Sequence, residues 1–310
     1  MNTIYGFGNA LVDIEIRISE IQLQDIEIKK GSMKHIAKEE LAMYLETYSK
    51  NIHSKLPGGS IANSLYAANK HGAKTHYSCS LGDDEYGQYF IDSFKDELGD
   101  VSYSRSNLDT GICLIFVTPD GQRTMAAHLG ANLDLSPKSL NIDKLKQSKY
   151  LLFDNFSLST NNGLSTAQSA LEESADLKIC FGISDASLIE ENLSNLMWLS
   201  SRKLHMLYGN QIEMSAIKKL ISMNTNNTLV TDGENGARYN EQYVEAPKIN
   251  MINSNGAGDA LIGTFLSCLE NSDSIESLMK SVNYASKVCS ANGPRPVSYT
   301  HLTLPTIYSV

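Results

Sequence analysis

Short apolar strings alternate with amphipathic stretches along most of the chain. The strings read as strands: residues 4–18, 75–81, 150–153, 178–183, 204–208, 228–232, 238–239 and 243–246. The amphipathic stretches carry apolar side chains at helical spacing: residues 38–48, 60–70, 82–98, 165–173, 256–270 and 275–290. Strands that alternate with helices are typical of a mostly parallel sheet covered by helices, so the pattern predicts an α/β protein.

Two regions depart from this alternation and favour β structure. Residues 112–117 and 123–128 flank the sequence Thr-Pro-Asp-Gly at 118–121, which predicts a hairpin. A short polar–apolar alternation also continues into the twenties. We therefore expect residues 14–34 and 101–128 to form a small β lid outside the main sheet, with residues 1–296 forming one domain.

A glycine-rich turn at residues 253–259, Asn-Ser-Asn-Gly-Ala-Gly-Asp, leads directly into one of the predicted helices. The amides of Gly256, Ala257 and Gly258 would lie at the helix N-terminus, where unpaired N–H groups bind anions. Asp259 stands beside them as a carboxylate that can take a proton. An alcohol that attacks a phosphoryl group needs both features, so the turn suggests a kinase site. The alternative is a glycine turn that only introduces a core helix.

Composition narrows the choice of partners. The 310-residue chain has a net charge of −9 and no run of four Lys or Arg residues, so neither nucleic acid nor an anionic membrane is expected to bind. The five cysteines are widely spaced without a Cys-x-x-Cys motif, which argues against a zinc site or a disulfide framework. Without a signal-like N-terminus or a long apolar run, we expect a cytoplasmic protein.

A second glycine-containing stretch, Pro-Gly-Gly-Ser at 57–60, precedes the helix predicted for residues 60–70. Gly58 and Gly59 would let the backbone approach a ligand closely, and Ser60 could cap the helix. Asn63 follows one turn later and could face the same ligand. An ordinary loop-to-helix junction would explain these residues equally well.

Three further polar residues could have either a functional or a purely structural role. Asn210 and Glu213 lie three residues apart at a strand-to-helix junction, where they could orient water bound to Mg²⁺. A capping-box variant explains the same spacing, and the spacing alone favours the cap. Arg123, just after the predicted hairpin turn, could reach an anion or could be a solvated strand end.

Three stretches in a fixed order resemble the PfkB/ribokinase family of sugar and nucleoside kinases. Residues 57–63 through 82–87 are similar to the N-terminal signature of that family, and residues 253–259 resemble its C-terminal signature. Asn210 and Glu213 match its Asn-x-x-Glu element. The resemblance covers about residues 1–296. Residues 110–111 and 122–125 look most like the bacterial adenosine-kinase-like branch.

The resemblance implies a ribokinase-like three-layer α/β/α sandwich with a mostly parallel central sheet and a small β lid. It implies transfer of the γ-phosphate of ATP, with Mg²⁺, to a primary hydroxyl of a sugar or nucleoside. Asp259 would be the general base, and the Gly256–Gly258 backbone the anion hole. The resemblance also implies that the acceptor is bound by Asp13, Gly58, Gly59 and Asn63, with Arg123 over the site. Asn210 and Glu213 would hold magnesium through water. The nucleotide would be bound by Thr231, Gly233, Gly236 and Asn283.

Some features leave alternatives open. The family signature usually begins with Asp-Thr where this chain has Asn253 and Ser254, so a potassium requirement stays open. Residues 153–156 differ from the expected segment, so the choice between sugar and nucleoside also stays open, as does that between monomer and homodimer. Residues 297–310 resemble translated cloning sequence, and we expect them to be non-native.

Two other functions are possible for such a chain. One is a non-catalytic nucleotide or sugar sensor with the same fold, which the presence of Asp259 disfavours because a binder needs no base. The other is an unrelated dinucleotide-binding protein. No Gly-x-Gly-x-x-Gly follows the first predicted strand, which disfavours this second alternative.

Overall fold

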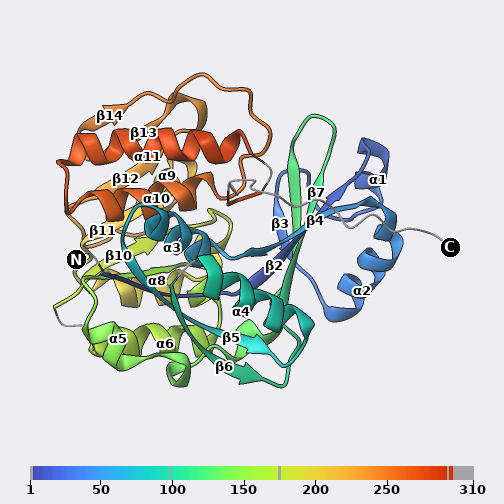
Figure 1. The fold of residues 1–310 in the computed structure, drawn as a ribbon, viewed down its shortest axis with the longest axis horizontal. Coiled ribbons are helices and arrows are strands. Elements are labelled where there is room, and N and C mark those ends of the chain that lie inside the picture. The colour runs from blue at the N-terminus through green and yellow to red at the C-terminus, as the bar shows by residue number, and fades with distance from the viewer. Residues whose placement is uncertain (1–2, 98, 174–175, 292, 296–310) are drawn as a thin grey trace.

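The computed structural model describes residues 3–97, 99–173, 176–291 and 293–295 (Figure 1). Residues 297–310, the predicted non-native tail, lie outside the described residues. Two sheets are present. The larger has nine strands in the order β14 (Gln242–Val244), β13 (Ala237–Tyr239), β12 (Thr228–Thr231), β11 (Met206–Asn210), β10 (Lys178–Gly182), β9 (Tyr150–Asp154), β1 (Thr3–Phe7), β5 (Lys74–Gly82) and β6 (Asp100–Ser106).

Seven of these strands, from β12 to β6, run parallel, and β13 and β14 add an antiparallel edge. Helices cover both faces of the sheet. One face packs against α3 (Ser60–Lys70), α4 (Glu85–Glu97), α10 (Ala257–Cys268) and α11 (Ser274–Cys289). The other packs against α5 (Ile142–Lys146), α6 (Asn161–Glu172), α7 (Leu188–Glu191), α8 (Leu193–Ser200) and α9 (Gln211–Leu220).

The predicted parallel sheet and its helices are thus confirmed. The central parallel strands, such as β5 and β9, are buried on both faces, which explains why their sequences are continuous apolar strings. Short 3₁₀ helices complete the connections: η1 (Ser49–Asn51), η2 (Gly130–Asp134), η3 (Pro137–Ser139), η4 (Ser157–Ser159) and η5 (Gly233–Asn235). No helix in the described part of the chain is long and apolar enough to cross a membrane.

The second sheet stands beside the first (Figure 1) and has the order β3 (Met33–His35), β8 (Arg123–His128), β7 (Gly111–Val117), β2 (Leu11–Arg17) and β4 (Ile52–Gly58). Together with α1 (Glu20–Gln24) and α2 (Lys38–Thr47) it forms the unit called the lid below. One face of the lid sheet packs against the two helices, for example through Phe116 on Tyr44 and Tyr48. The other face carries a smaller apolar cluster around Cys113, Ile115 and Ala127, and among the described residues no helix of the lid packs on it.

The lid differs from the prediction in three ways. Residues 20–24 form α1, not a strand, because Ser19 and Gln22 make a reciprocal capping box that starts a helix. Strand β4, which pairs with β2, was not foreseen. Residues 101–106 belong to β6 at the edge of the large sheet, paired with β5, so only 111–128 of the expected segment 101–128 forms lid strands.

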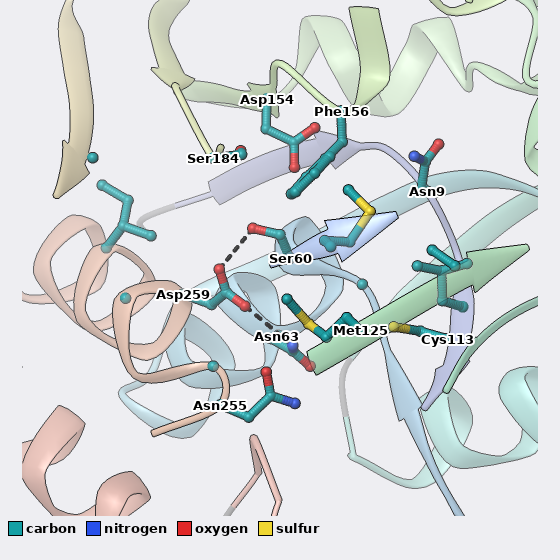
Figure 2. Close-up of a pocket in the computed structure, with 18 of the residues that line it drawn as sticks. Asn9, Ser60, Asn63, Cys113, Met125, Asp154, Phe156, Ser184, Asn255 and Asp259 are labelled. Atoms are coloured by element: carbon teal, nitrogen blue, oxygen red, sulfur yellow. Dashed lines mark hydrogen bonds between the residues drawn. The ribbon is translucent and has the colours of Figure 1, made fainter. Parts of the chain in front are cut away.

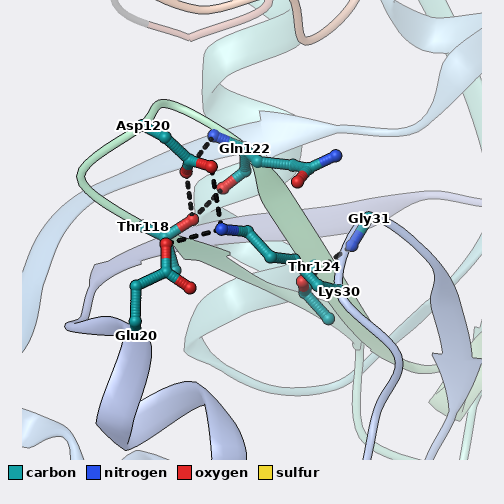
Figure 3. A network of polar contacts seen from close by, with 7 residues as sticks. All are labelled: Glu20, Lys30, Gly31, Thr118, Asp120, Gln122 and Thr124. Atoms are coloured by element: carbon teal, nitrogen blue, oxygen red, sulfur yellow. Dashed lines mark hydrogen bonds and ion pairs between the residues drawn. The ribbon is translucent and has the colours of Figure 1, made fainter.

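A polar network fixes the outer end of the lid (Figure 3). Lys30 forms ion pairs with Glu20 on α1 and with Asp120 in the β7–β8 turn. The Thr118 hydroxyl donates to the Asp120 carboxylate at 2.6 Å, which holds the turn in shape. Helix α1 and the hairpin turn are therefore tied together. Because both ion pairs are exposed to solvent, each contributes little to stability.

Candidate active site

A cavity of about 360 Å³ lies between the carboxyl ends of the large-sheet strands and the uncovered face of the lid (Figure 2). Ligands of open α/β sheets bind at this edge, beyond the carboxyl ends of the strands. The lid, the strand ends and the first turns of α3 and α10 all supply lining residues. They include Asp13, His35, Gly59, Ser60, Asn63, Cys113, Ile115, Met125, Ala127, Asp154, Phe156, Ser184, Tyr208, Asn210, Glu213, Thr231, Asn255, Gly256, Gly258 and Asp259.

Asp259 lies in the first turn of α10 and points into this cavity (Figure 2). Its Oδ1 accepts a hydrogen bond from Ser60 Oγ at 2.6 Å, and its Oδ2 accepts one from Asn63 Nδ2 at 3.1 Å. Burial raises the pKa of Asp259, while these two hydrogen bonds and the charge of Arg295 act in the opposite direction. A carboxylate of raised pKa is a stronger base than an exposed one, and it is held here in a fixed orientation.

Ser60 corrects one detail of the sequence interpretation. The residue that caps α3 is Gly59, and no side chain bonds to the first amides of that helix. The Ser60 hydroxyl instead serves Asp259. The sequence prediction missed this role because the two residues are 199 positions apart, and only the packing of α3 on α10 brings them together.

The turn before α10 has the shape expected of an anion-binding turn. Gly256 adopts a left-handed conformation with φ of 72°, and a Cβ there would lie 2.4 Å from Cβ of Pro294. Only glycine fits both constraints. Asn253 Oδ1 accepts the amide of Asn255 at 2.8 Å, which closes the front of the turn.

Two of the three expected anion-binding amides are available. The amide of Ala257 donates to the Ser254 carbonyl at 3.3 Å, whereas those of Gly256 and Gly258 have no partner among the described residues. Both glycines also line the cavity. Arg123, at the start of β8, donates through Nη2 to the Ser254 hydroxyl, so the lid contacts the turn directly.

Asp13, on lid strand β2, is only 9% exposed. A Cβ on Gly58 would lie 2.2 Å from its Oδ1, so Gly58 makes room for this carboxylate. Burial raises the pKa of Asp13 to about 7, against the effects of the Arg295 charge and a 3.4 Å hydrogen bond from Asn255. Gly59, with φ of 95°, lines the cavity next to it.

The lid contributes an apolar wall to the cavity. Cys113 and Ile115 on β7 and Met125 and Ala127 on β8 line the cavity; Cys113 and Met125 are labelled in Figure 2. Phe156, which follows β9, faces this wall from the opposite side of the cavity. Side chains at alternate positions of one strand point to one face, so the odd-numbered residues of β7 share this wall.

Asp154 and Ser184 are lining residues that the sequence analysis missed. Asp154 ends β9, and its Oδ1 accepts from the amide and the hydroxyl of Ser157 at 3.0 and 2.7 Å. Burial raises the pKa of Asp154 to about 6. Ser184 follows β10 with a positive φ of 66°, which is unusual for a residue other than glycine. Their position directly after predicted strands is the signal that could have identified them.

Asn210 and Glu213 form the capping box that their spacing favoured. Asn210 Oδ1 accepts the Glu213 amide at 2.9 Å, and Glu213 Oε2 accepts the Asn210 amide at 2.9 Å. Asn210 Nδ2 also donates to Glu213 Oε1 at 2.6 Å. Both residues line the cavity as well, so capping does not exclude a second role. Burial raises the pKa of Glu213.

The residues expected to bind nucleotide divide into two groups. Thr231, at the end of β12, lines the cavity. Gly233 and Asn283 are exposed, and neither they nor Gly236 line it. Gly236 has its own structural reason to be glycine, because a Cβ there would lie 2.1 Å from the carbonyl oxygen of Val244 on β14.

A dedicated metal cage is absent from the part of the chain that the structure describes, since no three His, Cys, Asp or Glu side chains are grouped suitably. Magnesium keeps several of its waters and takes one or two protein carboxylates together with phosphate oxygens. The side-chain oxygens of Glu213 and Asn210, near the anion-binding turn, fit that mode of binding.

Comparison with known proteins agrees with this architecture. The structure superposes on that of adenosine kinase from Sinorhizobium meliloti with a TM-score of 0.87, at 23% identity over 96% of each chain. The protein therefore has the ribokinase-like α/β fold. Residues 33–299 match the model of the pfkB family carbohydrate kinases, and the chain belongs to that family. Both the fold and the family inferred from the sequence are confirmed.

Two curated relatives illustrate the range of the family. Adenosine kinase 2 of Arabidopsis thaliana is 25% identical over 92% of this chain and 92% of its own length. A protein named probable fructokinase-2, from the same plant, is 27% identical over 74% of this chain and 79% of its own length. Similar identity to proteins named for a nucleoside and for a sugar leaves the acceptor class open.

Proposed function

We propose that this protein transfers the γ-phosphate of ATP to a primary hydroxyl group, with Asp259 as general base. The position of Asp259 supports this most directly. Its carboxylate points into the cavity next to the free amides of Gly256 and Gly258, held by hydrogen bonds from Ser60 and Asn63. A proton acceptor and an anion site are thereby combined at the start of one helix.

In this proposal the Asp259 carboxylate takes the proton of the acceptor hydroxyl as that oxygen attacks phosphorus. General base catalysis of this kind contributes about 10²- to 10⁴-fold in rate. The amides of Gly256 and Gly258 stabilise the charge on the transferred group, and loss of one such donor costs about 3–4 kcal/mol. Arg123 adds a positive charge from the lid. Asp13, beside Gly59, accepts hydrogen bonds from the acceptor's other hydroxyls.

The phosphate side of the cavity suits ATP and Mg²⁺. When bound, Mg²⁺ would neutralise charge on the phosphate oxygens. Glu213 and Asn210 hold each other's side chains in place, so they present fixed oxygens to the waters of the ion. Thr231, which lines the cavity, faces the nucleotide, and Gly233, Gly236 and Asn283, which lie outside the cavity, would contact the parts of the nucleotide that extend beyond it.

We further propose that the acceptor is a nucleoside. The wall formed by Cys113, Ile115, Met125 and Ala127, with Phe156 opposite, offers two apolar surfaces to a flat ring. A nucleobase between them would bury apolar area at about 25 cal/mol per Å². A free hexose, which carries hydroxyls on most of its carbons, would leave those hydroxyls unpaired against the wall.

A coupled ADP-release assay over purine and pyrimidine nucleosides, ribose and fructose tests both parts of the proposal. We expect kcat/KM for at least one nucleoside to exceed that for every sugar by 100-fold or more. A preference for a free sugar would refute the nucleoside assignment. Binding of ATP and acceptor without turnover of any compound would favour the sensor alternative. Repeating the assay with and without potassium resolves the question raised by Asn253.

A further inference from the structure

A buried arginine that follows the last helix contacts the groups around Asp259. Arg295 is 4% exposed, and its Nε donates to Asn63 Oδ1 at 3.0 Å. The same Asn63 side chain donates through Nδ2 to Asp259 Oδ2 at 3.1 Å. The three side chains thus form a chain of hydrogen bonds that ends on the proposed base.

We propose that Arg295 is a positioning residue that orients the Asn63 amide and, through it, the Asp259 carboxylate. The inference rests on the proposed function, in which Asp259 is the base. An asparagine amide has one accepting end and one donating end, whereas a guanidinium only donates. Arg295 therefore requires the oxygen of Asn63 to face it, which leaves the NH₂ group for Asp259.

The reversed amide would be unfavourable at both ends. Its NH₂ would meet the N–H of Arg295, and its oxygen would meet the carboxylate of Asp259. Without Arg295, the Asp259 carboxylate alone would favour this orientation of the Asn63 amide, so the preference for it would be weaker. The second hydrogen bond to Asp259 would then be populated less fully, and the carboxylate would turn more freely.

Aromatic rings hold the guanidinium in place. Its central carbon lies 5.6 Å from the centroid of Tyr66 on α3 and 5.4 Å from that of Phe94 on α4. Cation–π contacts of this kind are stronger when they are desolvated. They fix the plane of the guanidinium, and the direction of its N–H bonds follows from that plane.

The backbone before the arginine is also constrained. Gly293 has φ of 78°, and a Cβ there would lie 2.3 Å from Leu56 Cδ1 on lid strand β4. Pro294 packs against Gly256 in the anion-binding turn. Within three residues the segment therefore contacts the lid, the turn before α10 and Asn63, the hydrogen-bond partner of Asp259, and these contacts fix the position of the arginine.

The charge of Arg295 adds a second effect on the base. It lowers the pKa values of Asp259 and Asp13, in opposition to the effect of burial. The remaining titratable or charged groups that face Asp259 or line the same cavity come from other elements: Asp13 (β2), His35 (β3), Cys113 (β7), Arg123 (β8), Asp154 (β9), Tyr208 (β11) and Glu213 (α9). Since three of these are carboxyl groups, loss of Arg295 should raise the pKa of Asp259 further.

Arg295→Met, which keeps the apolar stem, and Arg295→Lys, which keeps the charge, test the proposal. For Arg295→Met we expect kcat/KM at pH 7 to fall about 10- to 100-fold, the effect of one hydrogen bond to a charged donor. The acid limb of its kcat/KM profile should move to higher pH. Arg295→Lys should restore the position of that limb and part of the rate. Arg202→Met, which removes an exposed arginine 5.7 Å from the Trp198 ring on α8, is the matched control.

Several outcomes would overturn the proposal. One is a folded Arg295→Met protein with wild-type kcat/KM and an unmoved acid limb. Another is a lower melting temperature and lower rate with no movement of the limb, since this indicates only a structural role. If Arg295→Met does not fold, a fully additive double-mutant cycle between Arg295→Lys and Asn63→Ala would refute the coupling. Unchanged turnover in Asp259→Asn would refute the proposed function itself, which separates the two failures.

Discussion

Asp259→Asn is the most direct test of the proposed chemistry. The substitution keeps the shape of the side chain and removes its ability to accept a proton. It also disturbs the two hydrogen bonds, because Ser60 and Asn63 both donate to the carboxylate in the structure and an amide has only one accepting end. The Ser60 hydroxyl can rotate to accept instead, whereas the NH₂ group of Asn63 cannot.

The expected effect on rate follows from the role of the base. Loss of a factor of about 10²–10⁴ corresponds to about 2.7–5.4 kcal/mol of transition-state stabilisation. The dissociation constant for ATP should change little, because the anion-binding groups are backbone amides that the substitution leaves in place. Stability should not fall at neutral pH. Burial raises the pKa of Asp259, so its charge opposes folding there and a neutral amide removes that cost.

The assay is ADP release under saturating ATP and acceptor, with ATP affinity measured separately by calorimetry. Asp273→Asn is the matched control. That carboxylate caps α11 by accepting the Glu276 amide at 2.8 Å, and asparagine caps a helix equally well. A kcat for Asp259→Asn within threefold of the wild type, in a protein that binds ATP normally, would refute the role of Asp259 as base.

Three other substitutions test separate parts of the site. Asp13→Asn should raise the acceptor KM about tenfold and flatten the pH dependence of the melting temperature. The pKa of Asp13 in the folded protein, about 7, lies above its ordinary value of 3.8. The contribution of Asp13 to the stability of the fold is therefore complete below about pH 4 and is lost as pH rises through 7. An unchanged dependence of the melting temperature on pH in Asp13→Asn would contradict this. Glu213→Gln, which can still complete the capping box, should raise the half-saturating Mg²⁺ concentration several-fold; an unchanged Mg²⁺ titration would exclude that role. Gly256→Ala places a Cβ against Pro294 at a backbone φ of 72°. We expect it to lower kcat, to weaken ATP binding and to destabilise the fold by about 1–3 kcal/mol, as measured by activity assays, ATP titration and thermal melts. Wild-type ATP binding in this variant would argue against the turn as the phosphate site.

The hydrophobic pattern predicted the central strands of the large sheet well because they are buried on both faces, but it placed the exposed edge strand β6 in the lid. It failed at α1, where five residues are too few to establish a helical period and the Ser19 capping box decides the structure. It also failed at β4, which carries alternating buried and exposed residues but includes Pro57 and Gly58, residues that are depleted in strands.

The glycine turn and Asp259 could be located from sequence because their chemistry depends on local backbone geometry. Arg295 and Asp154 could not be located in that way. Arg295 reaches the site only because the segment after α11 folds back onto α3, and its partner Asn63 is 232 residues away. Asp154 directly follows a predicted strand, which marks it as a candidate, but its place in the cavity depends on which strands are neighbours in the sheet, and a sequence pattern does not give that order.

Strand β1 lies in the middle of the large sheet, with Ile4 opposite Thr75 of β5 on one side and Tyr150 of β9 on the other. During synthesis, β5, β6 and the whole lid are complete before β9 leaves the ribosome. Until then one edge of β1 has no partner in this sheet, and an unpaired apolar edge is where nascent chains aggregate. Most groups proposed to hold the acceptor belong to this early half, whereas Phe156, Glu213 and Asp259 belong to the later one. Pairing of β9 with β1 continues the large sheet from its early strands to its later ones, and the packing of α10 on α3 brings Asp259 to Ser60 and Asn63.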